Sequence, residues 1–172
     1  MLTIRRYRAA DAPTVWALND IPHQGDTEDP SVPLRLQPLF CPPPAFPDLA
    51  DIHATFIAAG GDFLVAELAG DLVGMAGFRA NERGQAQVLR VRVHPAVRRQ
   101  RVGARLMGAV ERRALELGFT EAFLDTSTHQ PAAMAFYQAL GYREVGRETR
   151  PEWSWTLVYF TKQLGSTRAT TR

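Results

Sequence analysis

The sequence predicts an α/β domain: a central mixed β-sheet of about seven strands, flanked by about four helices. Three short runs of apolar and β-branched residues follow one another between residues 63 and 93, as in an antiparallel meander. An amphipathic helical pattern then leads into a further strand, and a helical crossover of this kind joins parallel strands. The length of 172 residues suits one domain, which we place at residues 1–164.

The chain is expected to begin with a strand and a helix. Residues 2–6 alternate apolar and polar side chains, which predicts a short strand. Asp11 is a suitable N-cap, and Pro13 fits the first turn of a helix that we expect to reach about Leu18.

A proline-rich stretch and a second helix should follow. Residues 22–47 contain eight prolines, so regular structure is not expected there. From about Asp48 a helix would place Leu49, Ile52 and Phe56 on one face, and Gly60-Gly61 would end it.

The remaining elements alternate between the two periodicities. The expected strands are residues 63–68, 72–78, 87–93, 119–125, 142–147 and 153–161. The expected helices are residues 102–117, followed by Gly118 as a C-terminal cap, and residues 131–140, closed by Gly141. Residues 165–172 form a polar tail that we expect to be disordered.

Composition narrows the function classes. The formal net charge is only +2, which argues against a dedicated nucleic-acid-binding protein. Cys41 is the single cysteine, so neither an internal disulfide nor a thiolate zinc cluster is expected, and we predict no metal. No signal peptide and no apolar run of membrane-spanning length is visible, so we expect a cytoplasmic protein without a membrane partner.

The most informative stretch is a strand that runs into an arginine-rich turn and then a helix. Val88 to Val93 form the strand, and four of the eight residues from Arg98 to Arg105 are arginine. The first N–H groups of a helix have no intrahelical partner and attract anions. This order predicts a phosphate-binding turn, although a solvated helix start decorated with arginine would look the same.

The turn resembles that of the GCN5-related N-acetyltransferases. The run Arg98-Arg99-Gln100-Arg101-Val102-Gly103-Ala104 is similar to their Q/R-x-x-G-x-G/A turn, which binds the pyrophosphate of acetyl-coenzyme A. The resemblance implies that the preceding Val91, Arg92 and Val93 form a splayed strand whose backbone pairs with the pantetheine arm. Arg101 stands where the pattern has its first glycine, and the backbone would still cradle the phosphate if this residue keeps a negative φ, which arginine tolerates. Its side chain would lie in solvent or reach the 3′-phosphate of the coenzyme.

A second stretch resembles another signature of the same family. Gln130, Ala133 and Tyr137 match N-x-x-A-x-x-x-Y, with glutamine in the asparagine position, and Gly141 and Tyr142 follow in register. By this resemblance, Gln130 and Ala133 contact the coenzyme and Tyr137 gives a proton to the departing thiolate. A phenol with a pKa of about 10 is a weak acid beside a thiol with a pKa of about 8.5, but it can donate to a thiolate that forms in a dry cleft. The alternative role for Tyr137 is a core aromatic.

The amine must lose a proton before it attacks, so a base is needed. The strand at 87–93 holds no carboxylate, and Asp125 at the end of its own strand is our first candidate. Asp125 would otherwise cap the following turn, and Glu67, His129 and Glu152 are weaker candidates. A backbone N–H near Arg92 or Val93 would stabilise the oxyanion.

The resemblance implies transfer of an acetyl group from acetyl-coenzyme A to a primary amine, by direct attack in a ternary complex. The acceptor is a small molecule or a peptide; transfer to a protein lysine or N-terminus, and a sensor domain that binds acetyl-coenzyme A without turnover, stay open. Asp20, Asp26, Glu28 and Asp29 would attract a cationic amine or simply lie in a solvated loop. Trp153 and Trp155 should share one face of the last strand, in the core or beside the acceptor. The last two strands would also allow a homodimer.

Overall fold

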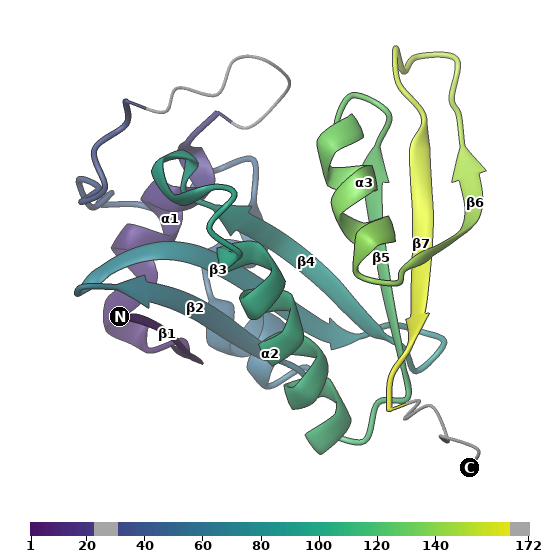
Figure 1. Cartoon of the computed structure of the whole chain (residues 1–172), viewed down its shortest axis with the longest axis horizontal. Coiled ribbons are helices and arrows are strands. Elements are labelled where there is room, and N and C mark those ends of the chain that lie inside the picture. Colours follow the sequence, from purple (N-terminus) through teal and green to yellow (C-terminus); the bar gives the residue numbers. More distant parts are fainter. Residues whose placement is uncertain (23–30, 166–172) are drawn as a thin grey trace.

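In the computed structural model, residues 1–22 and 31–165 are described, and they form a seven-stranded mixed sheet with helices on both faces (Figure 1). The strand order is β1-β2-β3-β4-β5-β7-β6. The strands are β1 (Leu2–Arg6), β2 (Asp62–Leu68), β3 (Asp71–Ala80), β4 (Ala86–Val93), β5 (Glu121–Ser127), β6 (Arg143–Glu148) and β7 (Leu157–Gln163). The helices are α1 (Ala12–Asp20), α2 (Val102–Glu116) and α3 (Pro131–Ala139). The predicted fold class is confirmed.

Alternation along the central strands sorts the core into two layers. On β2, Phe63 and Val65 pack with α1 and the residues around Phe56, whereas Leu64 packs with α2 on the opposite face. Each of these side chains is at most 4% exposed. The sheet is therefore buried on both sides in its N-terminal half, while α3 covers the C-terminal strands on the α2 side (Figure 1).

The parallel pair in the middle of the sheet is short. β4 and β5 pair only at Ala86↔Ala122 and Gln87↔Phe123, although both strands are described over their full length. Beyond Gln87 the two strands diverge, as Figure 1 shows. A β-bulge adds to this: Arg90 and Val91 together face Ala76 of β3, and Arg90 has a left-handed backbone with φ +58°. This divergence, here called the splay, confirms the expected splayed strand.

Two expectations about the fold are wrong. The regular helix from Asp48 is replaced by a 3₁₀ turn, η3 (Pro47–Leu49), and a π-helix, η4 (His53–Ile57). In η4 the Ala58 amide bonds to the carbonyl five residues back, on His53, at 2.8 Å, and this wider turn still buries Leu49, Ile52 and Phe56.

The last strand begins at Leu157 rather than at Trp153, so the two tryptophans share no strand face. Their rings stack on each other in the β6–β7 loop with centroids 4.2 Å apart, and the Arg150 guanidinium lies over Trp153. Mutual stacking gives both rings an apolar neighbour without a strand.

Within residues 1–22 and 31–165, no helix is both long and apolar enough to cross a bilayer.

Candidate functional site

The arginine-rich turn joins β4 to α2 through a short 3₁₀ turn, η5 (Pro95–Val97), which His94 caps by accepting the Ala96 N–H on its Nδ1. Arg99 and Arg101 both have left-handed backbones, with φ of +63° and +60°. The negative φ set as a condition at Arg101 is therefore not what the structure has. The chain must reverse sharply to enter α2, and it makes this reversal in the region where glycine is unstrained. Alternating backbone handedness of this kind turns successive N–H groups inward and builds an anion-binding concavity.

The side chains of the turn are arranged unequally. Arg98 folds back and donates from Nε to the Val93 carbonyl at 3.3 Å, and burial lowers the pKa of its guanidinium. Arg99, Gln100 and Arg101 are exposed. Val102 is buried against the N-terminal half of the sheet and fixes the first turn of α2. The backbone of the turn and the amide groups that begin α2, at Val102, Gly103 and Ala104, are therefore what it offers a phosphate.

Gly103 and α3 bring the two sequence motifs together. A Cβ atom on Gly103 would lie 3.1 Å from the ring of Phe136, so only a very small residue fits there. Gln130 begins α3, and its Oε1 accepts the Thr126 hydroxyl at 3.2 Å. Ala133 packs on the core cluster that also contains Tyr137. The arginine-rich turn and the Tyr137 helix are thus neighbours, as the paired motifs predict.

Tyr137 lies on α3 in a cluster of aromatic rings. Its ring contacts Tyr142 edge to face, with centroids 5.8 Å apart, and the residue is 8% exposed. Burial raises the pKa of the phenol to about 12; the Arg92 charge opposes this rise, and the Asp125 charge adds to it. Among the described residues the hydroxyl has no hydrogen-bond partner, so its proton is not committed elsewhere in the fold.

Asp125 lies across β5 from this cluster. The residue is exposed, yet desolvation by the surrounding protein raises the pKa of its carboxyl, and the Arg90 charge acts in the opposite direction. Its side chain has no hydrogen bond within the described part of the chain, so capping of the following turn is not seen. The turn is closed by other groups; for example, the backbone N–H of Gln130 donates to the Ser127 carbonyl at 2.9 Å.

Three arrangements beside the splay escaped prediction from sequence. The Arg90 guanidinium binds Asp48 through two hydrogen bonds of 2.7 and 2.9 Å and lies over the ring of Phe46. The Arg92 side chain is largely buried. His94 is fully buried and holds the Pro33 carbonyl at 3.0 Å on Nε2. The Arg90 and His94 contacts depend on partners more than 40 residues away in the sequence, and the burial of Arg92 depends on the bulge. A distant partner and a bulge both leave no local signal in the sequence.

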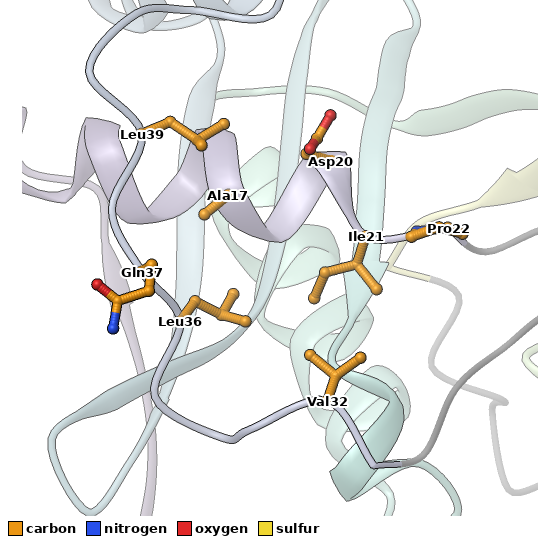
Figure 2. A pocket seen from close by; sticks show the side chains of 8 residues that line it. All are labelled: Ala17, Asp20, Ile21, Pro22, Val32, Leu36, Gln37 and Leu39. Atoms are coloured by element: carbon orange, nitrogen blue, oxygen red, sulfur yellow. The ribbon is translucent and has the colours of Figure 1, made fainter.

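Two pockets lie away from Tyr137. One of about 270 Å³ lies between the C-terminal end of α1 and residues 32–39, as Figure 2 shows. Its wall is mainly apolar, with Ile21, Val32 and Leu36 pointing inward and Asp20 at its edge. The other, of about 690 Å³, lies beside the β3–β4 turn and is lined by Phe123 and Tyr159 among others. The first is lined in part by the proline-rich stretch of residues 22–47.

Other expectations concern absences, or positions outside the described residues. Asp26, Glu28 and Asp29 lie outside the described residues, as does the tail beyond Gly165. Cys41 is an exposed free thiol. In the described part of the chain, no three histidine, cysteine or carboxylate side chains cluster closely enough to hold a metal ion.

Comparison with known proteins shows what this geometry resembles. The model of the acetyltransferase (GNAT) family matches residues 33–142. A relative in mouse, probable N-acetyltransferase family 8 member 5, is 29% identical over 131 residues, covering 70% of this chain and 58% of its own length. The chain thus spans little more than half the length of this curated relative.

Solved structures show the same fold at lower identity. A GNAT-family acetyltransferase from Staphylococcus aureus Mu50 superposes with a TM-score of 0.73 at 19% identity, covering 92% of this chain and 98% of that one. The Salmonella typhimurium protein yncA, solved with its cofactor acetyl-CoA, has a TM-score of 0.71 at 18% identity, with 99% and 98% covered.

Proposed function

Because this chain belongs to the acetyltransferase (GNAT) family, we propose that it transfers an acetyl group from acetyl-coenzyme A to a primary amine, by direct attack in a ternary complex. The observation that carries the proposal is Tyr137: a buried phenol with an uncommitted proton, on the helix that packs against the phosphate turn. A phosphate site alone would need no such group.

The coenzyme would lie along the splay. The backbone of Arg98 to Ala104 would hold the pyrophosphate at the start of α2. Beyond Gln87, β4 has no pairing with β5, so the edge of β4 around Val91, Arg92 and Val93 is open to the amide groups of the pantetheine arm. Gln130 and Ala133 would border the arm from α3, where a small side chain permits close approach.

The proposed chemistry needs three groups. Asp125 would take a proton from the acceptor ammonium, directly or through water, and its raised pKa makes it a better base than an ordinary aspartate. A backbone N–H at Arg92 or Val93 would stabilise the oxyanion of the tetrahedral intermediate. When that intermediate collapses, the carbon–sulfur bond breaks and the sulfur takes the Tyr137 proton.

The acceptor would approach from the α1 side, between the pocket of Figure 2 and the β6–β7 loop. A small amine and the lysine or N-terminus of a peptide are both proposed acceptors. A sensor that binds acetyl-coenzyme A without turnover is the second candidate function, because it would use the same phosphate turn.

A thiol-release assay with acetyl-coenzyme A and a panel of amines and peptides tests the proposal. Tyr137→Phe should lower kcat about 100-fold or more with little change in coenzyme A affinity, since only the proton donor is lost. Tyr142→Phe is the matched control, because it also removes the hydroxyl of a buried tyrosine in the same aromatic cluster, one whose charged neighbour is Glu111. Equal losses of kcat and coenzyme A affinity in Tyr137→Phe would contradict the assignment. Tight coenzyme A binding without thiol release on any acceptor would favour the sensor.

A further inference from the structure

His94 stands at the junction between β4 and the arginine-rich turn, and both nitrogens of its fully buried ring are bonded. Nδ1 accepts the Ala96 N–H at 3.1 Å, and Nε2 lies 3.0 Å from the carbonyl oxygen of Pro33. A ring nitrogen that accepts an N–H carries no proton, so the ring proton lies on Nε2 and is donated to Pro33. His94 thus connects the turn to residues 31–39, here called the proline segment, across 61 positions of sequence.

The Nδ1 bond leads to the proposed phosphate site. His94 is the N-cap of η5, and its backbone carbonyl accepts the Val97 N–H at 3.1 Å. The Val97 carbonyl in turn accepts the Gln100 N–H at 3.4 Å, within the arginine-rich turn. Val97 is also buried in one cluster with Val102, the first residue of α2. The cap on His94 therefore helps to fix the turn from which the free amides of α2 start.

The Nε2 bond leads to the pocket of Figure 2. Leu34, which follows the bonded carbonyl of Pro33, packs on the buried cluster that contains Val97. Val32 and Leu36, on either side, point instead into the pocket of about 270 Å³. Residues of the proline segment that contact the turn therefore alternate with residues that form the pocket wall.

We propose that His94 is a positioning residue that couples the coenzyme turn to the acceptor side of the enzyme, by passing order from the turn to the proline segment. The inference rests on the proposed acetyl transfer. A phosphate held by the amides of the turn would keep η5 in one conformation and the Ala96 bond formed. Because the imidazole is planar and rigid, Nε2 is then held on Pro33. By linkage, the coenzyme and the acceptor would each raise the other's affinity.

Two substitutions of His94 each break one of the two bonds. His94→Asn keeps an oxygen near the place of Nδ1, and asparagine is a good N-cap, but its side chain is too short to reach Pro33. His94→Gln places an amide N–H near the place of Nε2 and lacks the short side chain that caps. Arg35→Gln is the matched control, because it breaks another attachment of the proline segment, the exposed ion pair with Asp71 at 2.8 Å, and leaves His94 unchanged.

Hydrogen exchange of the proline segment, followed by mass spectrometry with and without saturating coenzyme A, tests the coupling without turnover. Coenzyme A should slow this exchange about threefold or more in the parent and in Arg35→Gln. His94→Asn should bind coenzyme A within about threefold of the parent, yet lose the protection. His94→Gln should bind coenzyme A about fivefold more weakly and keep the protection at saturation.

Three results of this experiment would overturn the inference. In the parent, coenzyme A binding without slower exchange in the proline segment would do so before any variant is made. Protection that persists in His94→Asn would show that the coenzyme orders the segment without His94. Equal effects of His94→Asn and His94→Gln on both measurements would show a merely structural role.

Steady-state kinetics separate failure of the inference from failure of acetyl transfer. With an acceptor from the thiol-release panel, His94→Asn should raise the acceptor KM about fivefold or more while kcat stays within about threefold, because Tyr137 and the turn are unchanged. An unchanged acceptor KM would overturn the role of His94 alone. Coenzyme A binding without thiol release on any acceptor would contradict acetyl transfer, and the exchange measurement would still decide the role of His94. A parent that does not bind coenzyme A would overturn both.

Discussion

Replacement of Arg101 by glycine should stabilise the protein, although glycine usually destabilises. Arg101 is the N-cap of α2 with φ 60° and ψ 13°, and its side chain is exposed. A left-handed backbone costs an L-residue roughly 1–2 kcal/mol, whereas the greater freedom of glycine in the unfolded chain costs about 0.5–1 kcal/mol. The difference leaves a net gain of about 0.5–1 kcal/mol.

Arg112→Gly provides the control for this prediction. Arg112 is exposed within α2, and glycine in a helix interior costs about 1 kcal/mol relative to a good helix former. The two arginine-to-glycine variants should therefore differ by roughly 1.5–2 kcal/mol. In a chain of this length that corresponds to a Tm difference of about 3–8 °C.

Urea and thermal unfolding, followed by circular dichroism, measure both variants against the parent. Coenzyme A affinity should change little in Arg101→Gly, because the turn binds anions through its backbone. If the two glycine variants were destabilised equally, the backbone at residue 101 would not be left-handed in solution, and the account of the turn would be refuted.

Two further predictions concern pH. The raised pKa of Asp125 means that its ionisation disfavours the folded state, so Asp125→Asn should be more stable than the parent at neutral pH. In pH-dependent unfolding, this difference in stability should vanish below about pH 3.8. The variant should also lose the acid limb of kcat/KM, and an unchanged limb would exclude Asp125 as the base. Burial would raise the pKa of Asp11, but the hydrogen bonds from Arg5 and the Arg8 N–H prevail and lower it. Asp11→Asn should therefore cost about 2 kcal/mol at neutral pH, a cost that fades as the pH falls below 3.8, and a pH-independent cost would contradict the ion pair.

Much of the fold was predictable from local patterns. Val102, Leu106 and Val110 repeat at helical spacing, and all three are buried along one side of α2. The apolar run at residues 63–68 predicted a strand, and the structure buries Phe63 and Val65 on one face of it and Leu64 on the other. Gly118 and Gly141 both have φ +92°, as the glycines that end the helices must.

The errors arose where distant or backbone constraints override local preference. Arginine itself does not signal a left-handed backbone, and the one hint at residue 101 was the glycine that the resembled turn has there; Arg101 adopts the backbone that the turn imposes. The helical spacing around Ile52 and Phe56 fits an α-helix and a π-helix equally well over so few turns. Tryptophans such as Trp153 and Trp155 are common in strands, yet here their two rings stack on each other within a loop.

In the candidate site, the motifs located Tyr137 and the phosphate turn, since both depend on residues close in sequence. They did not reveal the Arg90–Asp48 pair, the buried guanidinium of Arg92, or the contact of His94 with Pro33. Those depend on a bulge and on the path of the proline-rich segment across the sheet.

The short pairing of β4 with β5 divides the sheet into two parts, and different proposed functional groups belong to each part. Backbone hydrogen bonds arrange the strands in two blocks, β1-β2-β3-β4 and β5-β7-β6. The two blocks pair only at Ala86↔Ala122 and Gln87↔Phe123, and the side chains of Ala86 and Ala122 are almost fully buried. The phosphate turn belongs to the first block, and the β6–β7 loop with its stacked tryptophans belongs to the second. Under the proposed function, exchange of the β6–β7 loop would therefore change a wall proposed for the acceptor without altering the residues proposed to hold the coenzyme pyrophosphate.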